Sequence, residues 1–275
     1  ISGSTTGSFS ITPASLNVAA ATITKVYGSA DPSLAFTITD GALVQGDAFT
    51  GGLARMAGEN VGSYAIAQGT LSAGSNYTLG FTGATLAITP KPASVAAAAA
   101  TKVYGAVDPV LTGTLAGFLP ADNVVAIYGR TAGENVAGGP YAISAGFVAN
   151  PALTNYAITA TTAAFSITPA PLAVVANAQS KVYGAADPAL TFAATGLQFT
   201  DTAASVFSGA LSRVAGETVL GSPYAIQRGT LLANSNYTLG YTGANLAITP
   251  ATATIAVNGF TGVYDGQPHG ATGTA

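Results

Sequence analysis

One nine-residue phrase occurs three times in this chain, in nearly the same letters each time. It reads TKVYGSADP at residues 24–32, TKVYGAVDP at 101–109 and SKVYGAADP at 180–188. Other words follow it in a constant order, among them an Ala-Gly-Glu triplet, a Tyr-Ala-Ile triplet and an Asn-Tyr pair. A catalytic site is normally built once, whereas a structural unit can be copied. The repeat therefore predicts an array of similar modules.

The length of the repeat indicates how the array is organised. Each copy ends in Ile-Thr-Pro, and the four final prolines are 77, 79 and 81 residues apart. A period near 80 exceeds the roughly 20–50 residues of solenoid repeats and matches a small self-contained domain. We divide the chain into the end of a preceding repeat (1–13), three modules (14–90, 91–169 and 170–250) and the start of a further, variant module (251–275). The opening residues carry no signal peptide and read as the middle of a longer protein.

Alternation of apolar and polar residues predicts that most of each module is β-structure. Tyr77 and Leu79 share one face of an expected strand, whereas Leu86 and Ile88 lie on the opposite parity, after Gly83. We expect a hairpin or a bulge at this glycine and at the equivalent points of the other modules. The apolar residues of the Tyr-Ala-Ile word, of the Asn-Tyr strand and of the strand before each Ile-Thr-Pro proline should form the core.

One segment in each module departs from the alternation and predicts a short helix. The segments are 47–55, 122–130 and 201–213, and each begins with Asp and ends with Arg. Asp at the N-cap and Arg in the last turn suit the unpaired backbone groups and the dipole of a helix. The expected fold is therefore mainly β with one short helix per repeat, in three tandem β-grasp-like modules of about 80 residues.

Composition excludes several classes of partner. Only 7% of the residues are charged, far below the roughly 25% of an ordinary soluble protein. The eight Lys and Arg are scattered singly in a chain of net charge −3, so no basic surface is expected for nucleic acid or for an anionic membrane. The most apolar run, 93–103, is shorter than the roughly 20 residues that span a bilayer, and we expect no membrane insertion of this region.

Because charges are scarce, their placement is informative. Fifteen of the nineteen recur at equivalent positions of the three modules. They are Lys25, Asp31, Asp47, Arg55 and Glu59; Lys102, Asp108, Asp122, Arg130 and Glu134; and Lys181, Asp187, Asp201, Arg213 and Glu217. We interpret them as structural positions: one Asp starts the turn before Pro, one Asp caps the short helix, Glu receives backbone donors in the Ala-Gly-Glu turn, and Lys and Arg pair with these carboxylates.

Two other roles for the repeated polar residues stay open. Lys, an acidic residue and the repeated Asn76, Asn155 and Asn236 are the ingredients of a self-formed isopeptide crosslink. A Ca²⁺ ion between modules is the second alternative, with Asp31 or Asp108 and backbone carbonyls as ligands.

The sequence identifies no catalytic, cofactor-binding or metal-binding residue. His269 is the only histidine and is expected in an exposed loop, so a Ser-His-Asp site cannot be assembled within the chain.

The words KVYGxxDP, AGE, YAI, NYxL and ITP, in that order over about 80 residues, resemble a known family. It is the MBG ("mostly β-grasp") domain, which occurs in tandem in large bacterial surface proteins, including filamentous-haemagglutinin-like adhesins. VYDGQPHG at 263–270 resembles the opening of a related module in which Tyr-Asp-Gly replaces Tyr-Gly. The resemblance implies an extracellular stalk or adhesive array at the bacterial cell surface, and it brings no catalytic residues.

Two functions from different classes follow. The first is a structural repeat region, a stalk or fibre, of a large secreted adhesin that projects a distal functional domain. We expect it to be an extended rod, because Pro90, Pro92, Pro169 and Pro171 restrict the backbone where modules meet. Its partners would be the neighbouring repeats of the same chain. The alternative is a glycan- or cell-surface-binding module whose exposed Tyr and Thr contact host-cell, matrix or bacterial surface components. An enzyme is disfavoured, because three copies carry no nucleophile with its base.

Overall fold

The computed structural model describes residues 7–274. Contacts between residues divide the chain into two compact units. Unit 1 contains Ile1–Ala100, Val110–Thr131 and Ala142–Ala164, and unit 2 contains Thr101–Pro109, Ala132–Tyr141 and Phe165–Ala275. The first repeat therefore lies in unit 1 and the third in unit 2, while the second repeat contributes residues to both.

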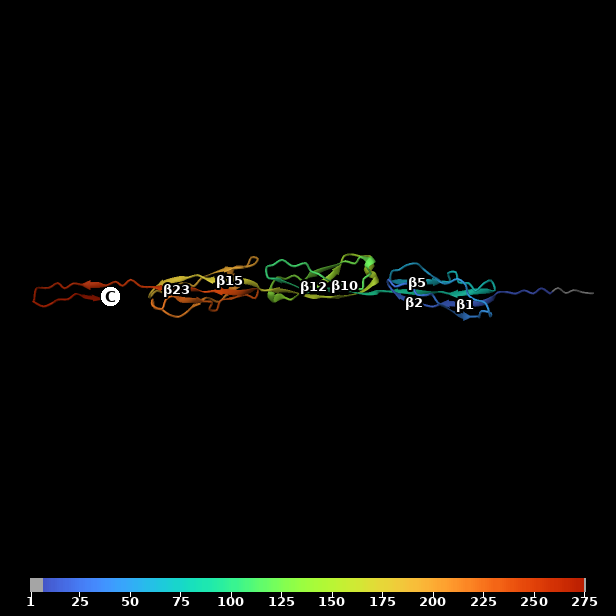
Figure 1. Cartoon of the computed structure of the whole chain (residues 1–275), viewed down its shortest axis with the longest axis horizontal. Helices are drawn as coiled ribbons and strands as arrows, with labels where there is room; N and C mark the ends of the chain where they lie inside the picture. Colours follow the sequence, from blue (N-terminus) through green and yellow to red (C-terminus); the bar gives the residue numbers. More distant parts are fainter. Residues whose placement is uncertain (1–6, 275) are drawn as a thin grey trace, which may run out of the picture. The chain divides into compact units, whose positions relative to one another are not determined.

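The first repeat consists of two small sheets that share two long segments of chain. The three-stranded sheet has the order β3 (Phe36–Asp40), β1 (Ala14–Ala20), β6 (Tyr77–Thr82). The four-stranded sheet has the order β2 (Ile23–Val26), β7 (Ala84–Thr89), β5 (Gly62–Ala67), β4 (Ala54–Arg55). β1 pairs in parallel with β6, and β2 pairs in parallel with β7. The segments 14–26 and 77–89 thus pass together from one sheet into the other, and Figure 1 shows β1 and β2 one after the other in this repeat.

The change of side-chain parity at Gly83 marks this passage between sheets. β6 and β7 belong to different sheets, so the predicted hairpin or bulge is wrong. Tyr77 packs with Leu16 in the core of the first sheet, whereas Leu86 and Ile88 pack in the core of the second. A strand that leaves one sheet for another must present its apolar residues to a new core, which explains the parity change.

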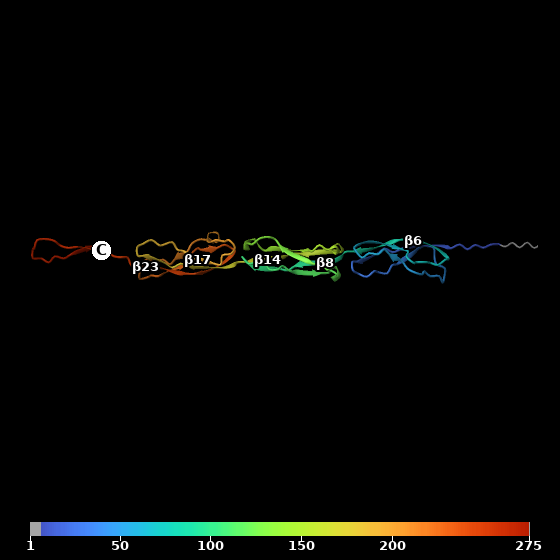
Figure 2. The ribbon, with the colours of Figure 1, turned by 90° about the horizontal axis from the view of Figure 1, so that it is seen from above.

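The third repeat has the same arrangement in unit 2. Its first sheet has the order β17 (Phe192–Thr195), β15 (Ala170–Ala176), β22 (Tyr237–Thr242). The second has the order β16 (Gln179–Val182), β23 (Ala244–Thr249), β20 (Tyr224–Gln227), β19 (Ser212–Arg213), and Figure 2 labels β17 and β23 in this repeat. A short additional pair joins β18 (Phe207–Ser208) to β21 (Leu232–Ala233).

The second repeat contributes the sheet β10 (Gly113–Ala116), β8 (Lys91–Ala97), β13 (Tyr156–Thr161) to unit 1. There, β11 (Ala126–Arg130) also pairs antiparallel with β12 (Tyr141–Phe147). The strands β9 (Ala100–Val103) and β14 (Ala163–Thr168) complete this repeat. The strand content and the threefold repetition confirm that the chain is mainly β and built from three tandem modules.

Most of the predicted core residues are buried, and the others, Tyr64, Leu79, Tyr141, Ile158 and Leu239, are half-buried. The isoleucines of the Tyr-Ala-Ile word, Ile66, Ile143 and Ile226, are at most 2% exposed. The tyrosines of the Asn-Tyr strands are also buried, as are both apolar residues of the strand before each Ile-Thr-Pro proline; these residues are Tyr77, Tyr156, Tyr237, Leu86, Ile88, Phe165, Ile167, Leu246 and Ile248. The assignment of strand faces from the alternation is confirmed.

The prediction of one short helix per repeat is wrong in the first two copies. Residues 47–55 contain an isolated β-bridge at Thr50 and end in β4, and residues 122–130 begin at the last residue of a 3-10 turn, η1 (Pro120–Asp122), and end in β11. In the third copy the helix is a single turn, α1 (Ala203–Val206), which is capped by Thr202 rather than by Asp201. Pairing of the Arg end of each segment with a neighbouring strand outweighs the local helix signals. The expected β-grasp-like fold included one short helix in each repeat. Within residues 7–274, α1 is the only α-helix.

Consecutive repeats are connected by a single residue between strands. Pro90 alone separates β7 from β8, and Pro169 alone separates β14 from β15. Pro92 lies inside β8, a central strand, and cannot donate a ladder hydrogen bond. It is tolerated because β10 pairs only with residues 94–97 of β8, so the strand has one neighbour at the proline.

The last described residues form a separate hairpin-like pair. β24 (Ala256–Asn258) pairs antiparallel with β25 (Thr272–Thr274). Between them His269 Nε2 lies 2.7 Å from Asp265 Oδ1, and its ring stacks on Phe260. Within the described part of the chain, no helix has the length and apolar character needed to cross a membrane.

Candidate functional site

Four repeated charges meet in one cluster in the first repeat. Lys25 Nζ, on β2, lies 2.6 Å from Asp31 Oδ1 and 2.5 Å from Glu59 Oε2. Arg55 Nε, on β4, lies 2.5 Å from Asp31 Oδ2, and its Nη2 binds Glu59. The two cationic side chains are 4% and 12% exposed, whereas the carboxylates are 41% and 63% exposed. A buried lysine and a half-buried arginine are thus held by two exposed carboxylates in a closed ring.

The cluster recurs in the other repeats. In the third, Lys181 binds Asp187 at 2.6 Å and Glu217 at 2.5 Å, and Arg213 binds the same two carboxylates. In the second, Lys102 binds Asp108 at 2.7 Å and also Glu134. Arg130 of this repeat donates to the Thr131 carbonyl. The acidic residue of the Ala-Gly-Glu turn therefore accepts from cationic side chains rather than from the expected backbone donors.

The arginine of the cluster connects two of the repeated words. Arg55 Nη1 donates to the carbonyl of Gly58 at 2.6 Å, and its guanidinium lies 5.6 Å from the centroid of the Tyr64 ring. Gly58 has φ +146°, and a Cβ there would lie 2.2 Å from Tyr64 Cε1. The glycine of Ala-Gly-Glu is therefore required because its backbone lies against the tyrosine of Tyr-Ala-Ile. Gly133 and Gly216 have the same relation to Tyr141 and Tyr224.

The Asp that opens each expected helix binds tyrosine instead. The hydroxyls of Tyr77 and Tyr237 donate to Asp47 and Asp201, each at 2.6 Å, and Tyr156 donates to Asp122. Each of these tyrosine hydroxyls also accepts a backbone N–H, from Val44, Leu119 or Gln198. Burial, followed by the hydrogen bond to the neighbouring carboxylate, raises the pKa of Tyr156 and of Tyr237 to about 12. These hydroxyls therefore remain neutral donors at physiological pH.

Five residues of unit 1 connect the first repeat to the second, and we call them the first junction: Tyr27, Asn60, Val61, Asp122 and Asn155. The Tyr27 hydroxyl donates to the Asp122 carboxylate at 3.1 and 3.2 Å. Asn155 Oδ1 accepts the Val61 backbone N–H at 2.8 Å, and its Nδ2 donates to Asn60 Oδ1 at 3.0 Å. Asn155 is 3% exposed, so one buried carboxamide binds two groups of the preceding repeat.

Unit 2 contains the equivalent second junction, formed by Tyr104, Asn135, Val136, Asp201 and Asn236. Tyr104 donates to Asp201 at 3.0 Å. Asn236 Oδ1 accepts the Val136 N–H at 2.9 Å, and its Nδ2 donates to Asn135 Oδ1 at 3.0 Å. The distances of the first junction are reproduced to within 0.2 Å in these contacts. The two junctions therefore consist of the same contacts between equivalent residues.

The junctions explain the phrase that occurs three times. Its tyrosine reaches the carboxylate of the next repeat, and its glycine adopts a positive φ at the turn and lies against the next repeat. A Cβ at Gly28 would lie 2.5 Å from Leu119 Cδ1, and one at Gly105 would lie 2.4 Å from Gln198 Oε1. Sequence reasoning missed this role. The signal was present as the recurrence of Tyr, Asp and Asn at fixed positions, but nothing in one module indicates that they meet across a boundary.

The structure bears on both alternatives for the repeated polar residues. Asn155 and Asn236 bind the preceding repeat, whereas the lysines are bound by carboxylates. Hydrogen bonds from Arg55 and then Lys25 lower the pKa of Asp31 to about 2, and bonds to Asp31 and Glu59 raise the pKa of Lys25. Amide formation needs an un-ionised acid and a neutral amine, and the cluster stabilises the opposite state of each.

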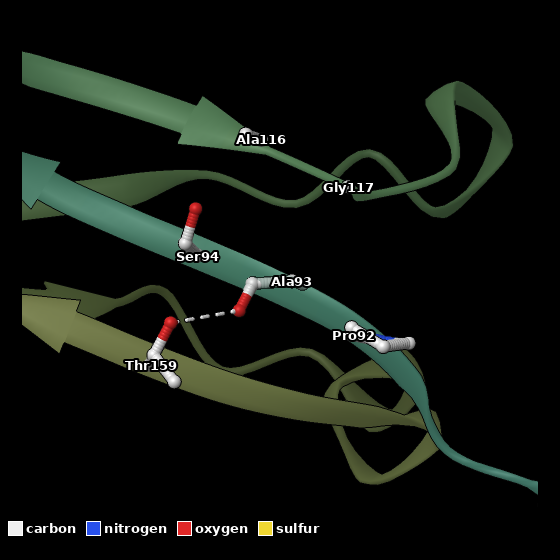
Figure 3. Close-up of a pocket in the computed structure, with 6 residues that line it drawn as sticks. All are labelled: Pro92, Ala93, Ser94, Ala116, Gly117 and Thr159. Atoms are coloured by element: carbon white, nitrogen blue, oxygen red, sulfur yellow. Dashed lines mark hydrogen bonds between the residues drawn. The ribbon is translucent and has the colours of Figure 1, made fainter.

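A calcium site based on Asp31 or Asp108 meets a similar obstacle, because each of these carboxylates binds a lysine ammonium. Residues 7–274 contain no group of three or more His, Cys, Asp or Glu side chains placed to hold a metal ion. Figure 3 shows the lining of a surface depression over β8, β10 and β13, in which the Thr159 hydroxyl donates to the Ala93 carbonyl at 3.4 Å. Its lining offers small apolar groups and the hydroxyls of Ser94 and Thr159.

The charge clusters predict stability that is lost in acid. Hydrogen bonds from arginine and then lysine lower the pKa of Asp31 and of Asp187 from 3.8 to about 2. A carboxyl group whose pKa is lowered by folding stabilises the fold above its unfolded pKa, and this contribution is lost as the pH falls to the folded pKa. We expect the urea midpoint to decrease between about pH 4 and pH 2. The Asp187→Asn variant should be less stable than the original protein at pH 7, and its urea midpoint should decrease less between about pH 4 and pH 2. An equal decrease in the two proteins would contradict a stabilising role of the Asp187 carboxylate.

Replacing a junction asparagine by alanine should destabilise the protein only where another repeat precedes that asparagine. Asn155→Ala removes a buried carboxamide and leaves the Val61 N–H and the Asn60 side chain without that partner, so we expect a loss of about 1–3 kcal/mol. Asn76→Ala is the matched control, because Asn76 occupies the same place in the first repeat and is exposed. Its effect should stay within about 0.5 kcal/mol. Hydrogen exchange of the β6 and β13 amides measures both, and equal losses would refute the role of the junction.

Comparison with models of known protein families shows what these repeats are. The MBG domain of the YGX type matches three times, over residues 16–87, 93–166 and 172–247. Each match lies within one of the three repeats, and together they cover well over half of the chain. A search of curated proteins found no match to the chain. The chain therefore belongs to the MBG domain family, of the YGX type, and carries three tandem copies of the domain.

Proposed function

We propose that this chain is a structural repeat region, a stalk or fibre, of a large secreted bacterial adhesin, and that it holds a distal functional domain away from the cell surface. MBG domains are structural repeat modules and are typically found in surface proteins. The observation that carries the proposal is the duplication of the junction: the same tyrosine, aspartate and asparagine contacts occur between the first and second repeats and between the second and third.

A repeated junction favours a stiff array for a physical reason. Each junction combines a buried carboxamide with two hydrogen bonds, a tyrosine bound to a carboxylate, and an edge-on contact between tyrosine rings at 5.5 or 5.3 Å. These contacts require defined orientations of both neighbours. The connection is one proline with a restricted φ, in contrast to the Gly/Ser-rich sequences of flexible linkers.

The alternative function, direct binding of glycans or cell surfaces, depends on exposed aromatic rings. Two of the three repeated tyrosines, Tyr27 and Tyr104, are engaged in junctions, and Tyr104 is 6% exposed. Their role in linking repeats accounts for their recurrence without a ligand. We therefore prefer the stalk, and a glycan-array screen of the whole chain tests the alternative, since reproducible binding of one glycan class would favour it.

The stalk predicts an extended particle in solution. A module with strands of about 8–10 residues is roughly 30–40 Å long, so three in line should reach about 100–120 Å. A compact globule of 275 residues would have a radius of gyration near 19 Å. Small-angle X-ray scattering separates the two cases. Replacing Pro90 and Pro92 together by glycine should leave the modules folded and reduce the mean end-to-end distance.

Compact scattering of the unmodified chain would remove the physical basis of the stalk. Location is tested separately on intact cells of the source bacterium with an antibody raised against the chain. Labelling without permeabilisation supports exposure at the surface. Labelling that appears only after permeabilisation would place the chain inside the cell and contradict the adhesin assignment.

A further inference from the structure

The upstream ends of the three repeats share an aspartate and an asparagine at equivalent positions, but these residues differ in exposure. We call the residues that receive the preceding repeat the upstream face. In the second repeat this face comprises Leu119, Asp122 and Asn155, which are half-buried or buried beneath the first repeat. In the third repeat Asp201 is half-buried and Asn236 is 8% exposed. The upstream face is thus covered wherever another repeat precedes it.

The first repeat carries an upstream face that is open. Its residues are Val44, Asp47 and Asn76, assigned by the backbone N–H that Val44, like Leu119, donates to the hydroxyl of the strand tyrosine. Val44 is 66% exposed, and both Asp47 and Asn76 are exposed. Within the described residues Asp47 accepts a single tyrosine hydroxyl, that of Tyr77, whereas Asp122 accepts those of both Tyr27 and Tyr156.

We propose that the upstream face of the first repeat is a docking surface for a further module of the same YGX type. The tyrosine of that module's Tyr-Gly turn would donate to Asp47, its turn glycine would cover Val44, and the asparagine after its Ala-Gly-Glu would bind Asn76. The occupant is specified by continuity with the two junctions, which use the same three chemical groups at equivalent positions. This inference goes beyond the proposed function, because it holds wherever the protein is located.

The chain that leads into the first repeat agrees with this occupant. Residues 9–13 read Phe-Ser-Ile-Thr-Pro, which is identical to the ending before the third repeat and shares Ile-Thr-Pro with the ending before the second, and Ala14 follows Pro13 at the start of β1 without a spacer. Ile11, Thr12 and Pro13 line a small depression together with Ser75 and Asn76. The last residues of a preceding module would therefore enter beside Asn76.

The downstream end of the third repeat shows that the junction is selective. Tyr183 is 54% exposed, and a Cβ at Gly184 would meet no atom within 4 Å. The asparagine of the first two Ala-Gly-Glu-Asn loops is replaced there by Thr218, whose hydroxyl lies 3.1 Å from the Tyr224 hydroxyl within the same repeat. This end cannot form the pair of carboxamides. We therefore assign the docking surface for a YGX module with an Ala-Gly-Glu-Asn loop to the upstream face of the first repeat, and not to the downstream end of the third.

The absence of cysteine from the chain allows a direct test by crosslinking of introduced cysteines. A copy of residues 14–90 is inserted between Pro13 and Ala14 of the whole chain, and two cysteines are introduced by Asn60→Cys in the copy and Asn76→Cys in the original first repeat. We expect a short bis-maleimide crosslinker to join this pair, because two hydrogen-bonded carboxamides leave their Cβ atoms too far apart for a direct disulfide but close enough for the crosslinker. The 275-residue chain with Asn60→Cys and Asn155→Cys is the positive control, because those side chains are 3.0 Å apart.

The matched negative control places both cysteines on upstream faces, with Asn76→Cys in the copy and in the original. These two positions would lie a whole module apart and should not be crosslinked. Crosslinking of the Asn60 and Asn76 pair without crosslinking of this control supports the proposal. An uncrosslinked Asn60 and Asn76 pair beside a crosslinked positive control would overturn it and leave the stalk proposal standing. A positive control that is not crosslinked would overturn the junction geometry itself.

Discussion

Ile226→Ala is expected to lower the free energy of unfolding of the third repeat by about 2–5 kcal/mol, the range for truncation of a buried isoleucine. Ile226 is 2% exposed and packs with Tyr224, Leu246 and Ile248 between β20 and β23. The loss combines the transfer free energy of the removed methyl and methylene groups with the cavity that remains. Hydrogen exchange of the β20 amides is the appropriate measurement, because it reports on this repeat and not on its two relatives.

The control for this variant is Ile38→Ala on β3, where the same side chain is 43% exposed. Its loss should be below about 1 kcal/mol, because truncation of a half-exposed residue opens no cavity. A loss below about 0.5 kcal/mol for Ile226→Ala itself would mean that the side chain does not belong to the core.

Gly216→Ala is the second substitution with a large expected effect. Gly216 has φ +152°, and a Cβ there would lie 1.9 Å from Tyr224 Cε1. The backbone conformation alone disfavours alanine by about 1–3 kcal/mol, and displacement of the Tyr224 ring adds to this. The ring also covers the Arg213 guanidinium, whose centre lies 5.7 Å from the ring centroid. We therefore expect destabilisation accompanied by a weakened charge cluster.

Two measurements separate this mechanism from a general glycine effect. Gly129→Ala on β11 is the control, because Gly129 is not at a positive φ and an added Cβ meets no atom within 4 Å. It should change stability by less than about 0.5 kcal/mol. The acid-induced decrease in stability should become shallower in Gly216→Ala if the cluster of Asp187, Arg213 and Glu217 is loosened. Equal stability of the two variants would show that the glycine and tyrosine do not pack as described.

Much of the fold follows from local pattern. The period near 80 predicts three modules, and the alternation predicts that Ile66, Ile143 and Ile226 face a core, because side chains of a strand point alternately to its two faces. The helix prediction failed where it relied on end signals alone. Asp122 and Arg130 suit a helix, but pairing of β11 with β12 and the tyrosine bound to Asp122 decide the conformation.

The sequence alone determined that this protein is an array of β-modules and which isoleucines face their cores, because both depend on spacing within one module and on repetition between modules. The tertiary structure alone decided that the chain passes between sheets at Gly83, that the glycine of Ala-Gly-Glu lies against the tyrosine of Tyr-Ala-Ile, and that Tyr27 meets Asp122 while Asn155 meets Asn60. The physical reason is separation along the chain. The two groups of each junction contact are 94 to 101 residues apart, and a pattern within one module cannot reveal a partner that belongs to the next copy.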